Sequence, residues 1–290
     1  MPQLKRLQLG EIHDQPWCPR VLRNAVTDFL QYSVNHWGQY TPLLPTLCYF
    51  LQRVEAERIV DLCSGASGPW QQMHRTVGRA FGESFRIVLT DRYPNLAAFR
   101  LTRALCGGVV DFREESLDAS ALPAGLSGFR TLFGCFHHFH PVQARGVLQN
   151  AVDSGQGIGI FEMTDRRAAS LLAMLSVPFF VLLHTPKVRP FSWSRLFFTY
   201  LLPLLPCLIM VDGVISCLRS YTTEELAQLT ASLIGAPYDW EIRQLDSPRS
   251  PFPIIYAIGC PRVAVQGEAQ QQDLCTSQTA NNACGSPKRC

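Results

Sequence analysis

The sequence predicts an α/β protein with a doubly wound, mostly parallel seven-stranded sheet, helices on both faces, and an apolar helical insertion after the fifth strand. Three observations support this prediction. Apolar runs of strand length alternate with helical periods over residues 57–165. Most of these runs are continuously apolar, as in parallel strands covered on both faces. Two long apolar runs in 168–218 then interrupt the alternation.

Length and composition fit one domain. The chain has 290 residues, a net charge of +3 and 17% charged residues, so no nucleic-acid partner is expected. Eleven cysteines without a C-x-x-C pair indicate reduced thiols, and the N-terminal residues lack the apolar core of a secretory signal. We expect an N-terminal arm and helices in 1–56, the domain in 57–262 and a disordered tail in 263–290.

The first strand ends in a turn of small residues. Ile59 and Val60 suit a buried strand, which Asp61 closes. The small residues that follow let the backbone approach a ligand, and a helix from about Pro69 directs its N-terminal N–H groups there. A carboxylate beside such donors suits a zwitterion better than a pyrophosphate. A simple turn in another α/β protein is the alternative.

This stretch resembles the first motif of the class I S-adenosylmethionine-dependent methyltransferases, an acid at a strand end followed by alternating glycines. Here the glycine positions hold Cys63, Gly65 and Ser67, with Gly68 next. The resemblance implies S-adenosyl-L-methionine as cofactor, and a seven-stranded sheet whose final strand enters antiparallel beside the sixth. The residues of this turn that it implies for cofactor binding are Asp61, Cys63, Ser64, Gly65 and Gly68.

The helices ahead of the first strand also gain a role from this resemblance. Helical periodicity begins at Arg20 and reaches Val34, and a second short run covers 44–54. In the family, such helices roof the cofactor and acceptor pocket. Candidate pocket walls, with ordinary core packing as the alternative role, are Tyr32, His36, Trp37 and Tyr40.

A second acid follows the next strand. A helix over 71–81 leads to a strand over 87–89, which ends at Asp91, thirty residues after Asp61. Parallel neighbours in a βαβ unit place both aspartates at the sheet edge where ligands bind. An acid in this position binds ribose hydroxyls in nicotinamide enzymes and in methyltransferases alike. Asp91 and the adjacent Arg92 are therefore candidate cofactor-binding residues.

The third strand region, 109–113, follows a helix over 96–106 and precedes a polar turn. Ser116, Leu117 and Asp118 in that turn resemble the family's adenine-binding motif, in which an acid accepts the exocyclic amine and an apolar neighbour covers the ring. A helix N-cap or a solvated turn acid is the alternative.

Histidines follow the fourth strand, expected over 131–136, where the family has its methyl-transfer site; Phe136 is a further candidate for cofactor binding. No Cys, Asp or Glu of the immediate run joins His137, His138 and His140 in a ligand set, so no metal site is expected. Imidazole titrates near neutral pH, which makes His137 or His138 a candidate general base for a hydroxyl acceptor. Shaping of the pocket is the alternative role.

The fifth strand, 157–164, contains Glu162, a weaker candidate for the base. Beyond the insertion, Thr222 or Thr223 is expected to cap the last large helix, and strands over 238–245 and 253–261 are expected to complete the sheet.

The insertion 168–218 holds two apolar runs of sixteen residues, each with proline and each shorter than the roughly 20 residues that span a bilayer. A lid, a hairpin in a membrane interface and a dimer surface all fit. Basic residues that favour anionic headgroups flank the runs: Arg166, Arg167, Lys187, Arg189, Arg195 and Arg219. The aromatic residues expected to wall a pocket for an apolar acceptor are Phe179, Phe180, Trp193, Phe197 and Phe198.

These features predict an S-adenosylmethionine-dependent methyltransferase that acts on a small apolar or lipid-like acceptor, with O-methylation favoured and nucleic acid or protein acceptors as the runner-up. One alternative is a catalytically inactive, membrane-associated S-adenosylmethionine-binding or scaffold protein, which the replaced glycines at 63 and 67 allow. A nicotinamide-dependent oxidoreductase fits less well because the G-x-G-x-x-G order is absent. We expect a cytoplasmic protein, peripheral on the membrane if the insertion is an interfacial hairpin.

Overall fold

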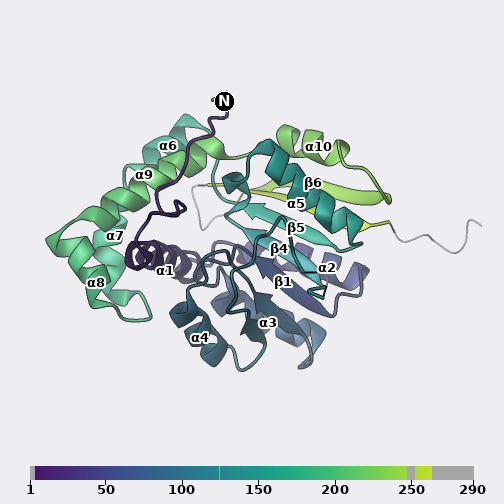
Figure 1. Cartoon of the computed structure of the whole chain (residues 1–290), viewed down its shortest axis with the longest axis horizontal. Coiled ribbons are helices and arrows are strands. Elements are labelled where there is room, and N and C mark those ends of the chain that lie inside the picture. Colours follow the sequence, from purple (N-terminus) through teal and green to yellow (C-terminus); the bar gives the residue numbers. More distant parts are fainter. Residues whose placement is uncertain (1–3, 124, 247–251, 263–290) are drawn as a thin grey trace, which may run out of the picture.

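A mixed seven-stranded sheet forms the centre of the protein (Figure 1). The computed structural model describes residues 4–123, 125–246 and 252–262, so the tail expected in 263–290 lies outside the described residues. The strands are β1 (Arg58–Leu62), β2 (Arg86–Leu89), β3 (Val110–Phe112), β4 (Phe129–Phe133), β5 (Ile158–Glu162), β6 (Tyr238–Leu245) and β7 (Ile254–Pro261).

The sheet has the order β3-β2-β1-β4-β5-β7-β6. The pairs β1–β2, β2–β3, β1–β4 and β4–β5 are parallel, whereas β7 pairs antiparallel with both β5 and β6. A seven-stranded sheet with an antiparallel final strand beside the sixth is therefore confirmed. The chain first runs outward from β1 to β3 and then continues on the other side of β1, at β4. Ligands of open α/β sheets bind outside the carboxyl ends of the strands at such a reversal.

Adjacent residues of β1 face opposite sides of the sheet and enter separate apolar cores. Ile59 packs with Trp70 and Phe99, from the side of α2, α3 and α4. Val60 packs with Val147 and Leu226, from the side of α5 and α10. The main helices are α1 (Arg20–His36), α2 (Leu44–Arg53), α3 (Trp70–Phe81), α4 (Leu96–Leu105), α5 (Pro141–Asp153) and α10 (Thr223–Ala231).

Most expected elements agree with these bounds, and Thr222 caps α10 in a capping box with Glu225. The fourth strand is an exception, because it ends at Phe133 and not at 136. Gly134 follows with a φ of +59°, and the next residues form a 3-10 turn, Phe136–His138. The backbone N–H of Phe136 donates to Oε1 of Glu162 at 2.6 Å, which fixes this turn against the end of β5.

The insertion forms an arm of helices beside α1, on the left in Figure 1. A third apolar cluster joins Val26 and Phe29 of α1 to Val181 and Leu205 of the arm. A buried ion pair between Asp28 Oδ2 and Arg195 Nη1, at 2.6 Å, adds a polar contact to this apolar contact. The arm consists of α6 (Ala168–Met174), α7 (Val177–His184), α8 (Trp193–Leu196), a π-helical turn (Phe197–Leu201) and α9 (Leu204–Arg219).

The length of the first apolar helical stretch differs from expectation. Among the described residues, Ala168–Lys187 forms a helical stretch of 20 residues that is long and apolar enough to cross a membrane, and 22% of its most apolar part is buried. Trp193–Leu201 and Leu204–Arg219 pass the same test only as a pair, and they are bent by 84°. The expectation that the first run is too short to span is therefore wrong on length, because the helical stretch continues to Lys187.

Candidate functional site

A cavity of about 810 Å³ lies at the carboxyl ends of β1, β2 and β4. Its lining residues come from the N-terminal arm, from α1, from the turns after these strands, and from α6, α7 and α9. Segments from both ends of the chain therefore enclose one space at the reversal of the sheet.

The aromatic residues expected around this cavity are divided between its wall and other contacts. Trp37 and Tyr40 line it, whereas Tyr32 and His36 stack on each other with ring centroids 5.1 Å apart. Of the five aromatic residues expected in the insertion, Phe180 lines the cavity. Phe179, Trp193 and Phe197 are exposed, and Phe198 packs against the third apolar cluster, so the expectation that these four wall the pocket is wrong.

The turn after β1 has a left-handed backbone at each of the positions where the family has glycine. The φ angles are +54° at Cys63, +58° at Gly65 and +95° at Ser67, and Gly68 follows at +51°. Non-glycine residues rarely adopt such angles. Hydrogen bonds to Ser67 support the turn, because its hydroxyl lies 2.7 Å from that of Thr102. The turn lines the cavity with Cys63, Ser64, Gly65, Ala66 and Gly68.

Asp61 lies behind this turn and does not line the cavity. Its side chain is 1% exposed, and Oδ1 accepts a hydrogen bond from the Thr131 hydroxyl at 2.6 Å. Burial raises the pKa of Asp61 to about 7, although the hydrogen bonds from Thr131 and Ser64 oppose this shift. In the structure Asp61 therefore supports the turn from behind, and whether it binds a cofactor stays a prediction.

Asp91 joins two turns at the cavity wall. Its Oδ2 accepts from the backbone N–H of Gly65 at 2.7 Å, and its Oδ1 accepts from that of Tyr93 at 2.7 Å. Burial raises the pKa of Asp91. Each carboxylate oxygen keeps a second lone pair for a ligand hydroxyl. Arg92 also lines the cavity.

The expected adenine-binding residues are divided between the cavity and its support. Asp118 is exposed and lines the cavity, and its Oδ1 accepts from the Ser120 hydroxyl at 2.6 Å. The Ser116 hydroxyl donates to the carbonyl of Arg92 at 2.6 Å. Leu117 packs against the core on the side of α5 and α10. The side chain of Phe136 is fully buried in the same core, away from the cavity lining.

His137 lies between two carboxylates at the end of β4. Its Nδ1 is 2.7 Å from Oε2 of Glu162, and its Nε2 is 3.2 Å from Oε1 of Glu11. Burial lowers the pKa of His137, but Glu162 and Glu11 outweigh this effect and raise the pKa to about 10. His137 therefore carries its proton at neutral pH in this environment, which does not favour the role of a free base.

His138 is more accessible and lines the cavity. Its Nδ1 contacts the carboxylate of Asp14, and its Nε2 lies 3.5 Å from Oε2 of Glu11. The roles of His137, His138 and Glu162 in catalysis stay predictions, but the structure brings all three residues together.

The N-terminal arm supplies the functional candidates that the sequence interpretation missed. Glu11 is 1% exposed and accepts a hydrogen bond from the Ser216 hydroxyl at 2.9 Å. His13 follows, with its Nδ1 2.8 Å from Oδ2 of Asp212. The run E-I-H-D in a proline-flanked arm is the only signal in the sequence. Nothing local connects it to histidines that lie 124 residues further along the chain.

Comparisons with known proteins give matches among solved structures only. No family model matches the chain, and no curated protein matches it. An O-methyltransferase family protein from Burkholderia thailandensis is 15% identical, with a TM-score of 0.45, over 83% of this chain and 60% of that one. A protein described as an O-methyltransferase from Nostoc punctiforme is 13% identical, with a TM-score of 0.49, over 88% of this chain and 64% of that one.

A protein described as a zinc-dependent alcohol dehydrogenase from Rhodobacter sphaeroides is 13% identical, with a TM-score of 0.45, over 84% of this chain and 98% of that one. This chain thus spans less than two thirds of the first two matched structures. At these identities and scores the matches do not assign an activity. The strand order is the observation that decides the fold. The chain has a mixed seven-stranded α/β fold, consistent with the sheet that the resemblance to class I methyltransferases implies.

The raised pKa of Asp61 predicts a pH-dependent stability. In the folded chain Asp61 has a pKa of about 7, against about 4 in the unfolded chain. The contribution of Asp61 to the free energy of unfolding is therefore fully present below pH 4 and is lost as the pH rises through 7. Asp61→Asn, which stays neutral and can still accept from Thr131, should therefore gain free energy of unfolding relative to wild type between about pH 5 and pH 8, up to about 4 kcal/mol.

Urea denaturation at both pH values measures this difference. Asp111→Asn is the matched control, because the Asp111 carboxylate is exposed and its removal should change the difference by less than about 0.5 kcal/mol. An Asp61→Asn variant that loses the same free energy at both pH values would contradict the assignment.

Proposed function

We propose that the protein is an S-adenosylmethionine-dependent methyltransferase that O-methylates a small apolar or lipid-like acceptor. The principal support is Asp91, which lines the cavity at the sheet reversal and accepts a hydrogen bond from Gly65 in the left-handed turn after β1. The carboxylate that we expect to bind the ribose hydroxyls is thus hydrogen-bonded to the turn of small residues.

The cavity lining carries charges of both signs. Five acids contribute to it, namely Glu11, Asp14, Asp91, Asp118 and Asp212, beside three arginines, Arg23, Arg92 and Arg219. The acids suit the sulfonium and the ammonium of S-adenosylmethionine, and the arginines suit its carboxylate. In our proposal the ribose hydroxyls bind Asp91, the adenine amine approaches Asp118, and the methionine part lies along the turn 63–68.

The chain's task in such a reaction is mainly alignment. Methyl transfer is an in-line displacement, so a rigid pocket that orients the acceptor and excludes water supplies much of the rate enhancement. The N-terminal arm, α1 and α9 cover the polar end of the cavity, where the partly exposed His138 can hydrogen-bond an acceptor hydroxyl.

Apolar side chains of the insertion support an apolar acceptor. Met174, Val177, Phe180 and Ile209 line the cavity together with the polar groups. A molecule with one polar group and an apolar body therefore matches this lining, with the hydroxyl at the histidines and the body against the insertion.

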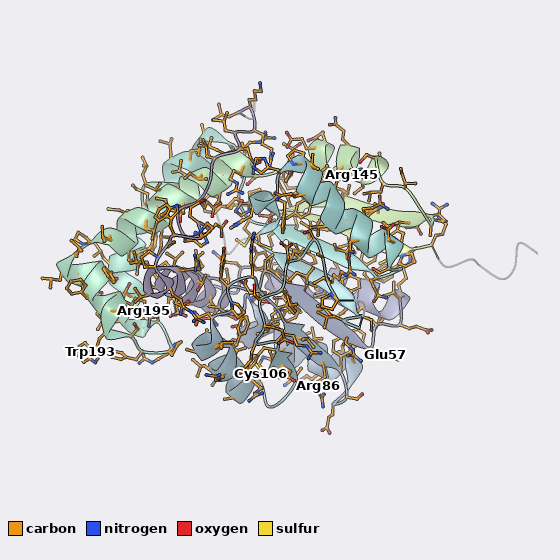
Figure 2. The ribbon with its side chains drawn as sticks, viewed as in Figure 1. Glu57, Arg86, Cys106, Arg145, Trp193 and Arg195 are labelled. Atoms are coloured by element: carbon orange, nitrogen blue, oxygen red, sulfur yellow. The ribbon has the colours of Figure 1, made fainter. Side chains whose placement is uncertain are left out.

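The outer face of the same insertion supports contact with a lipid surface. Its exposed apolar side chains include Trp193, 78% exposed, which Figure 2 draws at the outer edge of the arm. Asp212 is the one acid in 168–218, and it is buried. Arg166, Arg167, Arg195 and Arg219 are occupied in ion pairs, so Lys187 and Arg189 are the exposed cations. Two cations among aromatic residues and no exposed acid fit an anionic membrane interface.

Asp91→Ala should weaken S-adenosylmethionine binding by about 100-fold, because it removes a charged acceptor for two ribose hydroxyls. Calorimetry measures the dissociation constant. Asp111→Ala, at an exposed acid remote from the cavity lining, is the control and should bind like wild type. Binding of a nicotinamide cofactor in place of S-adenosylmethionine would exclude the proposal.

Transfer of a labelled methyl group distinguishes an enzyme from a scaffold. The purified protein is incubated with labelled cofactor and, in separate tubes, cell lipid extract, soluble small molecules, RNA and protein. We expect label in the lipid or apolar fraction, and none with Asp91→Ala. Label in RNA or protein alone would contradict the apolar acceptor, and cofactor binding without any transfer would favour the scaffold.

Trp193→Glu should lower binding to vesicles of phosphatidylcholine with phosphatidylserine by at least about tenfold, since burial of a large apolar side chain contributes about 1.5–3 kcal/mol. Co-sedimentation measures the bound fraction. Tyr49→Glu is the control: Tyr49 is 59% exposed on α2, away from the arm. Equal binding of the two variants, or a dimer in solution that covers the arm, would contradict the membrane contact.

A further inference from the structure

We propose that Glu11, His137 and His138 bind a divalent transition-metal ion at the polar end of the cavity. The three side chains come from the N-terminal arm and from the turn after β4. The sequence alone gave no reason to expect this site, because its carboxylate lies far from the histidines along the chain. The fold supplies the missing ligand.

The distances suit one ion. One ligand atom from each residue lies within 4.8 Å of the other two. Oε1 of Glu11 is 3.2 Å from Nε2 of His137, and Oε2 is 3.5 Å from Nε2 of His138. Two ligands bonded at about 2.1 Å to a tetrahedral ion are about 3.4 Å apart. Small side-chain movements are therefore sufficient to coordinate a metal.

The nitrogen atoms face the site in the orientation that metal binding needs. Nε2 of His137 is buried and faces Oε1 of Glu11 at 3.2 Å. Its Nδ1 is held by Glu162 at 2.7 Å. His138 repeats the arrangement, with Nδ1 at Asp14 and Nε2 toward Glu11. Carboxylates that hold the far nitrogen of a histidine are the usual outer ligand shell of protein metal sites.

The surrounding charges also favour a cation. Glu11, Asp14, Glu162 and Asp212 bring four carboxylates to this region, and Arg219 is the permanent cation in contact with Glu11. A divalent ion bound to His137 and His138 would replace protons as the source of positive charge.

The ligand set indicates the class of metal. Two imidazoles and a carboxylate suit Zn²⁺, Fe²⁺ or Mn²⁺ better than Mg²⁺ or Ca²⁺, which prefer oxygen ligands alone. Glu11, His137 and His138 all line the cavity. Three protein ligands with a remaining position open to the cavity are typical of a site that also binds a substrate atom. An acceptor with adjacent oxygen atoms fits such a position.

Zn²⁺ binding to the full chain, without an affinity tag and after treatment with a chelator, tests the proposal by calorimetry. The measurement needs neither cofactor nor acceptor, so it is independent of methyl transfer. We expect one Zn²⁺ site that Glu11→Gln and His138→Gln each weaken by at least about 100-fold. Glu162→Gln, which alters the carboxylate that holds Nδ1 of His137 and the backbone N–H of Phe136, should weaken it by about 10- to 100-fold.

His140→Gln is the matched control, since His140 is an exposed histidine of the same run and its loss should leave the site intact. Visible absorption of bound Co²⁺ reports the same site without calorimetry, and urea denaturation in chelator identifies any variant that fails to fold. A protein without Zn²⁺ binding, or a Zn²⁺ affinity that is equal in wild type and in folded Glu11→Gln and His138→Gln, would overturn the proposal.

Discussion

Buried charge is the constraint on which the arrangement of this protein depends. Glu11 is 1% exposed, and an ionised carboxylate is stable at such a position only with partners. Its partners are the Ser216 hydroxyl and the Arg219 guanidinium of α9 and the two histidines after β4. These contacts hold the N-terminal arm, the insertion and the sheet together at the polar end of the cavity.

The wall of the cavity formed by the turn after β1 depends on backbone geometry more than on residue type. Cys63 and Ser67 take left-handed angles that glycine adopts more easily, and the N–H of Gly65 donates to Asp91. The turn thus keeps the path of a glycine-rich motif with two glycines replaced. Asp61, behind it, acts through a hydrogen bond with Thr131 and not through the cavity lining.

The insertion has two faces with different surroundings. Its inner face closes the cavity with Val177 and Phe180 and packs on α1. Its outer face exposes Phe179 and Trp193, a large apolar area that a soluble surface rarely presents. A lid and a membrane contact, alternatives in the sequence interpretation, are thus compatible in one structure.

The sequence by itself determined the sheet, because strand periodicity, acids at strand ends and small-residue turns are local patterns. These patterns predict strands β1, β2 and β5 and the cap at Thr222. They also predict that Asp61 and Asp91 lie at strand ends. Tertiary structure decided which residues meet. Phe136, expected at the cofactor, is fully buried in the core, and Arg195, expected at the surface, pairs with Asp28. Glu11 reaches His137 and His138 only because the chain folds back across the sheet edge, and no local pattern encodes a contact between segments so far apart.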